Sequence, residues 1–275
     1  MLEKFIYENH LGQRFDGLAN GVYLNQSNLR DYGWDYATIN GKITRFYRGI
    51  KERSLPLVVH GATADEATAA KNRLHEIAEV DIVAAIPGKI FIGDYYTMGF
   101  IKASAKANYM RLLKHAKITL TLLSDDPAWY RDETHSFFPG SGNVAPVDGM
   151  GYPYDYPYDY AGTKARIINC DSVGSNAFKL RIYGPAVNPS VSIGGHIYAI
   201  NGTLAAKESL LIECSPKKRI TLNKPDGSRV NWFDKRNRDS YIFQEIPPGQ
   251  HTVVWNELFG FDLTIIEKRS EPKWI

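Results

Sequence analysis

The sequence predicts a mostly β protein in which an α+β domain with one helix is followed by an all-β sandwich. Two patterns carry this expectation. Residues 1–132 contain one segment with helical periodicity among alternating strands, and residues 164–275 contain about eight short strands separated by turn signals. The length of 275 residues allows two domains, each burying its own core.

The helix of the first domain is predicted within "GATADEATAAKNRLHEIAEV". Thr63 and Glu66 form a T-x-x-E capping box at its start. Apolar residues then recur at helical spacing at Ala67, Ala70, Leu74 and Ile77. The remainder of this domain is predicted as strand, most clearly in "LPLVVHG", in "GKIFIGDYYTMGFIKASAK" with breaks at Gly93 and Gly99, and in "HAKITLTLLSDDPAWY".

The third part of the chain, residues 164–275, is predicted to be entirely β. Strands are expected at "FKLRI", "PSVSIGG", "HIYAING", "SLLIEC", "RITLN", "SYIFQEI", "HTVVWN" and "FDLTIIEK". Gly194–Gly195, Asn201–Gly202, "PDG" and "PPGQ" mark turns between them. This spacing is typical of a jelly-roll sandwich, which we expect to fold without the rest of the chain.

Residues 133–163 form a connecting arm between the two domains. This stretch is rich in Gly, Pro and Tyr, carries four acids and no base, and lacks helical periodicity. Its most unusual part is "GYPYDYPYDYA", in which every second residue is a tyrosine: Tyr152, Tyr154, Tyr156, Tyr158 and Tyr160.

The alternation of these tyrosines predicts an aromatic ribbon. Successive side chains of an extended backbone point to opposite faces, so the five phenols share one face. Pro153 and Pro157 remove two backbone donors and favour a stiff, polyproline-like segment. We interpret the ribbon as a candidate interface that seals a seam between domains or subunits, with a solvated linker as the alternative.

The sequence matches none of the catalytic or metal-binding motifs with which we compared it. "LHEIAEV" begins like a zinc-protease helix, but the position four after His75 is Glu79, so we interpret His75 as a solvated helix residue. "PGSGNVA" lies in the arm without a flanking strand and helix. The seven histidines are scattered, and Asp125–Asp126 resemble a strand-end turn. We therefore expect no enzyme activity, no cofactor and no metal.

Composition excludes several other protein classes. A formal net charge of +3 is too small for a dedicated nucleic-acid binder, and no apolar run is long enough to insert in a membrane. Charges at Glu3, Lys4 and Glu8 argue against an export signal. Cys170 and Cys214 are expected to be reduced thiols, although their spacing alone leaves a disulfide open.

The chain resembles the distal tail proteins of long-tailed, siphovirus-type bacteriophages, a family of tail-tip hubs. The specific blocks are "FKLRIYGPAVNPSVSIGGHIYAINGTLAAKESLLIECSPKKRITLNKPDGSRVNWFD" and "PPGQHTVVWNELFGFDLTIIEKRSEPKWI". The matching positions are Tyr183, Gly184, Pro185, Asn188, Pro189, Gly227, Asn231, Phe233, Trp255, Arg269, Glu271, Pro272 and Trp274. The first third matches by order of elements and by "DDPAWY".

The resemblance implies a fold and a role. Residues 1–132 would form a ring-forming domain similar to tail-tube folds, a β-sandwich or barrel with one helix, and residues 164–275 a galectin-like jelly roll. The protein would be a structural hub: a homo-hexamer or double ring in the virion tail tip, assembled in the host cytoplasm. Its partners would be the tail tube protein, the tail-associated protein and receptor-binding or other baseplate proteins.

The galectin likeness raises a second hypothesis, a carbohydrate-binding adhesin that recognises the host surface. Galectins hold sugar with an H-x-N-x-R strand and a stacking Trp. His196 is followed by Tyr198 and Ile200 where the Asn and Arg are required, and Trp232 lacks the accompanying Glu-x-Arg. The sequence favours a docking scaffold over a lectin.

Ring contacts bury aromatic-rich surface, and two clusters in the first domain offer it. Trp34 lies in "DYGWDY" and Trp129 in "DDPAWY". Either residue is a candidate interface anchor, and the alternative for both is a core position in their own domain.

Replacing Tyr154, Tyr156 and Tyr158 with Ser tests the ribbon. If the tyrosines seal a seam, we expect ring assembly to weaken by about 2 kcal/mol or more per site, while the melting of each domain stays nearly unchanged. A solvated linker would tolerate the same changes within about 0.5 kcal/mol per site. Sedimentation and calorimetry on both proteins separate the two outcomes.

Overall fold

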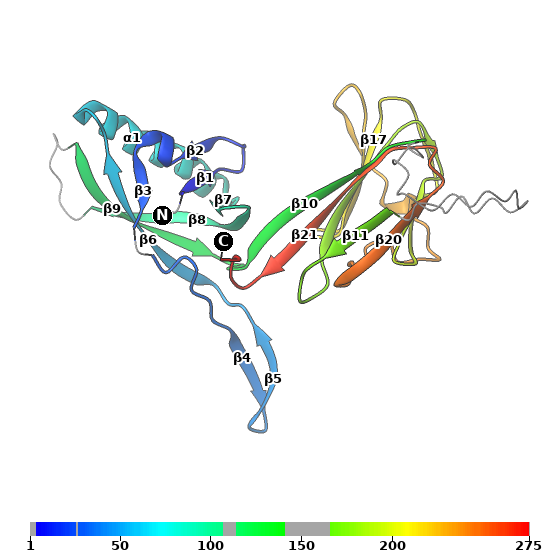
Figure 1. The fold of residues 1–275 in the computed structure, drawn as a ribbon, viewed down its shortest axis with the longest axis horizontal. Helices are drawn as coiled ribbons and strands as arrows, with labels where there is room; N and C mark the ends of the chain where they lie inside the picture. Colours follow the sequence, from blue (N-terminus) through cyan, green and yellow to red (C-terminus); the bar gives the residue numbers. More distant parts are fainter. Residues whose placement is uncertain (1–3, 26, 107–113, 141–165, 275) are drawn as a thin grey trace, which may run out of the picture. The chain divides into compact units, whose positions relative to one another are not determined.

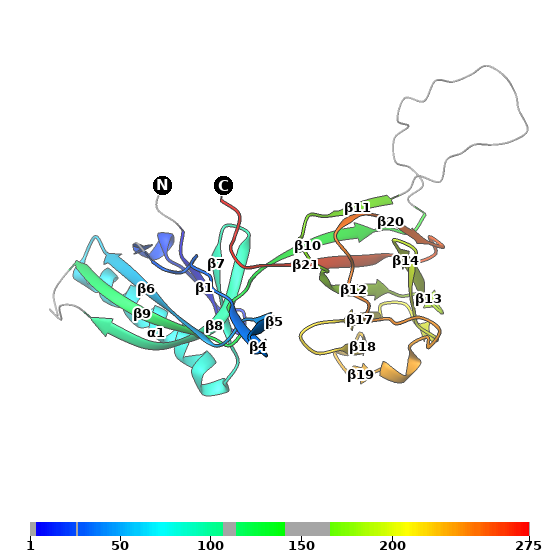
Figure 2. The same ribbon diagram turned by 90° about the horizontal axis from the view of Figure 1, so that it is seen from below.

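The computed structural model describes residues 4–25, 27–106, 114–140 and 166–274. Two compact units make up the chain, Met1–Arg131 with Lys268–Ile275, and Asp132–Glu267. The chain passes from the first unit to the second within one strand, β10, and returns within another, β21. The fold is mostly β (Figures 1 and 2), as the sequence predicts.

The first unit holds the only α-helix of the described residues. Its elements are β1 (Ile6–Glu8), β2 (Arg14–Asp16), the 3-10 helix η1 (Leu18–Asn20), β3 (Val22–Leu24), β4 (Asp35–Ile39), β5 (Lys42–Tyr47), β6 (Lys51–His60), α1 (Ala64–Ala84), β7 (Gly88–Ile92), β8 (Tyr95–Lys106), β9 (His115–Ser124) and the start of β10 (Trp129–Phe137). The break predicted at Gly93 is present, whereas β8 runs through Gly99 without one.

Strand β8 belongs to both sheets of this unit. Its first half pairs antiparallel with β7, which continues to β1 and β2, and its second half pairs with β9, which continues to β6 and β3. Gly99 lies where β8 changes partner, and a Cβ there would come within 2.7 Å of both Leu122 Cδ1 and Leu123 O. Glycine therefore allows the close approach of β9 at this point.

Helix α1 covers the sheets with its apolar stripe. Thr63 Oγ1 accepts from Glu66 N at 3.1 Å, as the predicted capping box requires, and the Glu66 side chain reaches back to Ala62 N at 2.9 Å, one residue before the N-cap Thr63. The predicted stripe is buried, at Ala67, Ala70, Leu74 and Ile77. It packs on β8, β6, β9 and β2.

The second unit is an antiparallel sandwich. Its further elements are β11 (Arg166–Cys170), β12 (Ala177–Tyr183), β13 (Ala186–Val187), β14 (Ser190–Ile193), β15 (His196–Ala199), β16 (Thr203–Leu204), β17 (Ser209–Glu213), β18 (Arg219–Asn223), β19 (Arg229–Asn231), the 3-10 helix η2 (Phe233–Lys235), β20 (Gly249–Trp255) and β21 (Phe261–Arg269). One sheet has the order β19-β18-β17-β12-β21, and the other has the order β11-β20-β14-β15.

The sandwich core is filled by the inward residues of both sheets. Leu180 on β12 and Leu210 on β17 meet Val191 on β14 and Val253 on β20 in one buried cluster. Cys170 and Cys214 are free thiols within this cluster, and burial raises the pKa of Cys170 to about 11.

The segment "SYIFQEI" is not the strand that its alternation predicts. It forms turns with one isolated bridge, between Asn176 and Ile246. Ile242, Phe243 and Ile246 are all buried in the sandwich core. The apolar spacing therefore reflects a loop that closes the core.

The structure divides the chain differently from the sequence-based boundaries at both ends of the sandwich. Asp132–Phe137 belong to the second unit, because Phe137 stacks on Phe261 with centroids 4.6 Å apart and meets Trp255 edge-on. Lys268–Ile275 belong to the first unit. There Lys268 Nζ contacts Asp126 Oδ2 at 2.7 Å.

Phe137→Ala tests the contribution of β10 to the sandwich. We expect a loss of about 3–5 kcal/mol of unfolding free energy in the second unit, because the change leaves a cavity beside Phe261. Phe138→Ala is the control, since Phe138 is exposed. Urea titration of Asp132–Glu267 as a fragment measures both, and equal stability of the two variants would contradict the assignment.

Candidate interaction surfaces

Strands β4 and β5 form a separate hairpin that extends away from the sheets of the first unit (Figure 1). The turn is Asn40–Gly41, with φ of 51° and 73°. Such a pair of positive φ angles is typical of a type I′ hairpin turn, which Asn-Gly favours. This hairpin is not among the elements predicted from the sequence, although the "INGK" turn signal is present in the chain.

The hairpin is apolar and exposed on both of its faces. Eight large side chains on it and its flanks are between 42% and 74% exposed: Tyr32, Trp34, Tyr36, Ile39, Ile43, Phe46, Tyr47 and Ile50. Within the described residues β4 pairs only with β5, so both outer edges keep unpaired backbone groups. An isolated two-stranded sheet is marginally stable in water, so this element is suited to contact another chain.

The base of the hairpin is anchored by Arg53, a guanidinium that is only 1% exposed. Its Nη2 donates to Pro127 O at 2.8 Å and to Asp31 O at 3.4 Å, and its Nη1 donates to Thr97 Oγ1 at 3.4 Å. Burial lowers the pKa of Arg53 to about 10, an effect that Asp31 partly opposes. Arg53 thus ties the start of the hairpin to the core strands.

The end of the chain supports the same base. Arg48 Nη2 donates to Ser270 Oγ at 2.9 Å, and the Arg48 guanidinium lies 4.0 Å above the ring of Trp34. Arg30 lies 4.3 Å above the ring of Trp274. Ser270 and Trp274 therefore contact the segments on either side of the hairpin.

The candidate interface residues from the sequence have different positions. Trp34 is 43% exposed at the hairpin base and remains a candidate. Trp129 is fully buried in the core of the first unit, which corresponds to the alternative considered for it. Tyr152, Tyr154, Tyr156, Tyr158 and Tyr160 lie outside the described residues.

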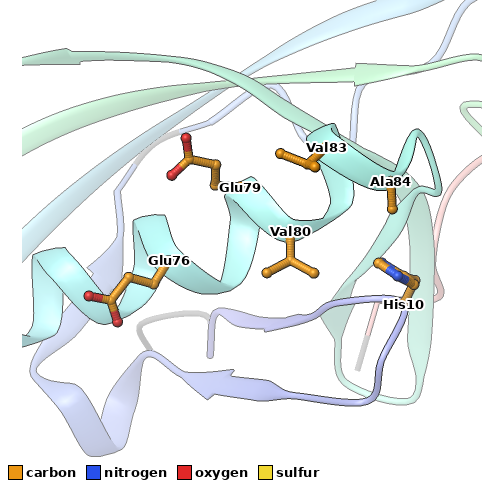
Figure 3. A pocket seen from close by; sticks show the side chains of 6 residues that line it. All are labelled: His10, Glu76, Glu79, Val80, Val83 and Ala84. Carbon is orange, nitrogen blue, oxygen red and sulfur yellow. The ribbon is translucent and has the colours of Figure 1, made fainter.

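A second apolar surface lies at the C-terminal end of α1. A pocket of about 450 Å³ lies between the helix and His10. Figure 3 shows the residues that line it: His10, Glu76, Glu79, Val80, Val83 and Ala84. Val83 is 82% exposed, and Ile82 and Ile86 are also exposed. Like the hairpin, this end of the helix presents large apolar groups to solvent.

The buried carboxylate of Asp81 links the last turns of the helix to the N-terminal strands. It accepts hydrogen bonds from the Tyr7 hydroxyl and from His10 N at 2.9 Å, and His10 Nδ1 lies 2.6 Å from its Oδ1. Burial, with the contact to Asp81, raises the pKa of Tyr7. A Cβ on Gly88 would lie 2.3 Å from Asp81 Oδ2, so only glycine leaves room for this cluster.

The histidines provide one pair that sequence spacing could not reveal. Pairing of β6 with β9 brings His60 beside His115, with their Nδ1 atoms 2.8 Å apart and rings stacked at 4.4 Å. They are 55 positions apart in the chain. Within the described residues, no group of three His, Cys, Asp or Glu side chains is arranged to hold a metal.

Other residues considered for chemistry have structural roles. His75 is not the solvated residue expected, because its Nε2 is buried and burial lowers its pKa. Burial would raise the pKa of Asp126, but hydrogen bonds from Lys268 and Tyr130 hold it below its usual range. None of the helices in the described part of the chain combines the length and apolar character needed to cross a membrane.

His196 and Trp232, which occupy the positions compared with the galectin sugar site, make contacts within the sandwich. His196 Nε2 lies 2.9 Å from Tyr241 O, and Trp232 packs against the sandwich core. Gly202 lies under Trp232, where a Cβ would be 2.9 Å from the indole.

No family model and no curated protein matches this chain. Solved structures do share its fold. The Dit protein of phage SPP1, described as a paradigm of the hub adsorption apparatus in Gram-positive infecting phages, aligns over 98% of this chain and 99% of its own with a TM-score of 0.58 and 13% identity. The chain has the fold of a phage hub protein.

Chains of the phage P2 baseplate in its activated conformation extend this likeness. The structure with Ca aligns over 99% of this chain and 100% of its own, with a TM-score of 0.61 and 13% identity. The structure with Sr aligns to the same extent, with a TM-score of 0.62 and 14% identity. The likeness covers both units, so it includes the α+β unit and the sandwich in the same order along one chain.

Arg53→Met tests the hairpin anchor. The substitution keeps side-chain length but leaves Pro127 O and Asp31 O without their charged donor, so we expect a loss of about 1–3 kcal/mol in the first unit. Hydrogen exchange of residues 31–50 should also accelerate. Lys51→Met is the matched control, because its Nζ reaches Asp31 O only at 3.5 Å. Equal exchange rates in both variants would contradict the anchoring role.

Proposed function

We propose that this protein is the structural hub of a phage tail tip. Six copies form a ring through the first unit, alone or as a double ring, and the ring joins the tail tube to the tail-associated protein. The fold likeness to phage hub and baseplate proteins over both units supports this role. In this proposal the protein acts in the virion after assembly in the host cytoplasm and catalyses no reaction.

The β4–β5 hairpin is the observation that carries the proposal. A closed ring requires a surface that fits a different surface of the neighbouring copy. The hairpin exposes apolar side chains on both faces and unpaired backbone groups at both edges. A neighbouring chain that covers it would bury the side chains and form hydrogen bonds with the backbone groups. Its fixed base at Arg53 and Trp34 sets the direction in which it extends.

The exposed end of α1 supplies a second contact in this proposal. Val83, Ile82 and Ile86 form an apolar surface, and Glu76 and Glu79 border the adjoining pocket. A hub contacts both copies of itself and other tail components, so it needs two separate apolar surfaces. We assign the hairpin to the ring and the α1 end to a further tail protein.

The sandwich unit is the attachment site for receptor-binding or other baseplate proteins in this proposal. The alternative function, a carbohydrate-binding adhesin, requires no ring. Mass in solution therefore separates the two functions.

The double substitution Ile39→Asp with Ile43→Asp tests the ring. These side chains are 64% and 55% exposed near the hairpin tip, so unit stability should change by no more than about 0.5 kcal/mol per site. Assembly should weaken by about 2 kcal/mol or more per site, because each aspartate places charge in an apolar contact. Light scattering over a concentration series and negative-stain imaging measure the ring.

Val173→Asp is the control for added charge, since Val173 is 96% exposed in the second unit. The ring should persist in this variant. A wild-type protein that stays monomeric both alone and with its tail partners would contradict the hub assignment. Rings that survive the double substitution would contradict the role of the hairpin alone.

A further inference from the structure

The outer face of the larger sandwich sheet contains a polar groove of about 690 Å³. Figure 2 shows β12, β17, β18 and β19, the strands that form it, one beside the next. Ser209, Glu213, Thr221 and Asn223 are half-buried and form its floor. Three exposed arginines, Arg181, Arg219 and Arg229, complete the lining of this groove.

Strand register places the groove residues on one face. Arg181 on β12 pairs with Leu211 on β17, which pairs with Thr221 on β18, which pairs with Asn231 on β19. The next row on the same face contains Ser209, Asn223 and Arg229, and the row on the other side contains Glu213 and Arg219. Residues opposite one another, or two apart along a strand, share a face.

The arginines give the groove a positive rim. Arg181, Arg219 and Arg229 line it together with one acid, Glu213. Within the described residues, neither Arg219 nor Arg229 forms an ion pair with an acid. A guanidinium binds phosphate or carboxylate through two parallel hydrogen bonds, and the amides and hydroxyls of the floor suit hydroxyl groups.

The lining does not resemble a protein-binding surface. Among the ten lining residues only Leu211 and Val230 are apolar, and none is aromatic. Protein interfaces depend on buried aromatic and aliphatic anchors, and such anchors are scarce among the residues that line this groove. The exposed ring of Tyr183 lies opposite Ser209 on this face, but it does not line the groove, and its hydroxyl donates to Asp262. The chemistry of the groove fits a ligand that is anionic and rich in hydroxyls.

We propose that this groove binds an anionic sugar or polyol chain, with phosphodiester or carboxylate groups on the arginines and hydroxyls on the floor. The site is separate from His196 and Trp232, the galectin-type positions, which do not line it. It adds ligand binding by the sandwich to the proposed hub role and does not depend on ring formation.

Calorimetric titration of the full-length protein tests the proposal with three probes. The probes are a glycerol phosphate oligomer, an oligogalacturonate and a neutral maltooligosaccharide, which distinguish phosphodiester, carboxylate and uncharged chains. We expect one or both anionic probes to bind and the neutral one not to bind. The double variant Arg219→Ser with Arg229→Ser should weaken binding roughly tenfold or more, because it removes two charged donors.

Lys235→Ser with Arg238→Ser is the matched control, since it removes the same charge from the same unit outside the groove. This control should keep wild-type affinity. Equal weakening in the two double variants, or no binding of either anionic probe by the wild type, overturns the proposal. If no anionic probe binds and the groove variant no longer binds other tail proteins, the groove would be assigned to protein docking instead. Light scattering on the same samples reports ring formation independently.

Discussion

The architecture of the first unit depends on a single strand that belongs to two sheets. Strand β8 pairs with β7 and then with β9, and the change of partner occurs at Gly99, where β9 approaches too closely for a side chain. The bulge between Ile101 and Ala103 adds the local bend. Both sheets consequently contribute to one core under α1, which fixes the direction of the helix.

This arrangement determines where apolar groups remain exposed. The apolar stripe of α1 is buried from Ala67 to Ala78, whereas Ile82 and Val83 in its last turn are exposed. The hairpin lies outside the shared core altogether, and it is held only at its base by Arg53, Arg48 and the returning end of the chain. A unit with a well-packed core thus carries two surfaces whose chemistry suits contact with other proteins.

The sandwich unit presents a different kind of surface. Its core lies between the two sheets, and the outer face of the larger sheet carries a groove lined by arginines, amides and hydroxyls. This contrast supports a division of roles within the chain. In the proposed hub, apolar contacts of the first unit hold the assembly, and the polar groove of the second unit is available to an anionic ligand.

Local sequence was sufficient for the elements whose periodicity is strong. The capping box of Thr63 and Glu66, the stripe from Ala67 to Ile77 and the alternation of β12 are each set by neighbours in the chain, and all are present. "SYIFQEI" alternates equally well, yet it closes the core as a loop. Alternation of apolar and polar residues indicates which side chains are buried. Whether the segment pairs as a strand depends on whether the edge of a sheet is free beside it.

The sequence by itself determined the fold class, the helix, the presence of a sandwich and the family resemblance, because these follow from local periodicity and from the order of motifs. Only the tertiary structure decided which residues share a surface. Strand pairing places Arg181 beside Leu211 and in one row with Asn231 across four strands, and the returning end of the chain brings Ser270 to Arg48. Burial places Trp129 in the core and leaves Trp34 exposed, although both lie in similar aromatic clusters. These contacts join residues that are far apart in the chain, so the local periodicity of the sequence cannot predict them.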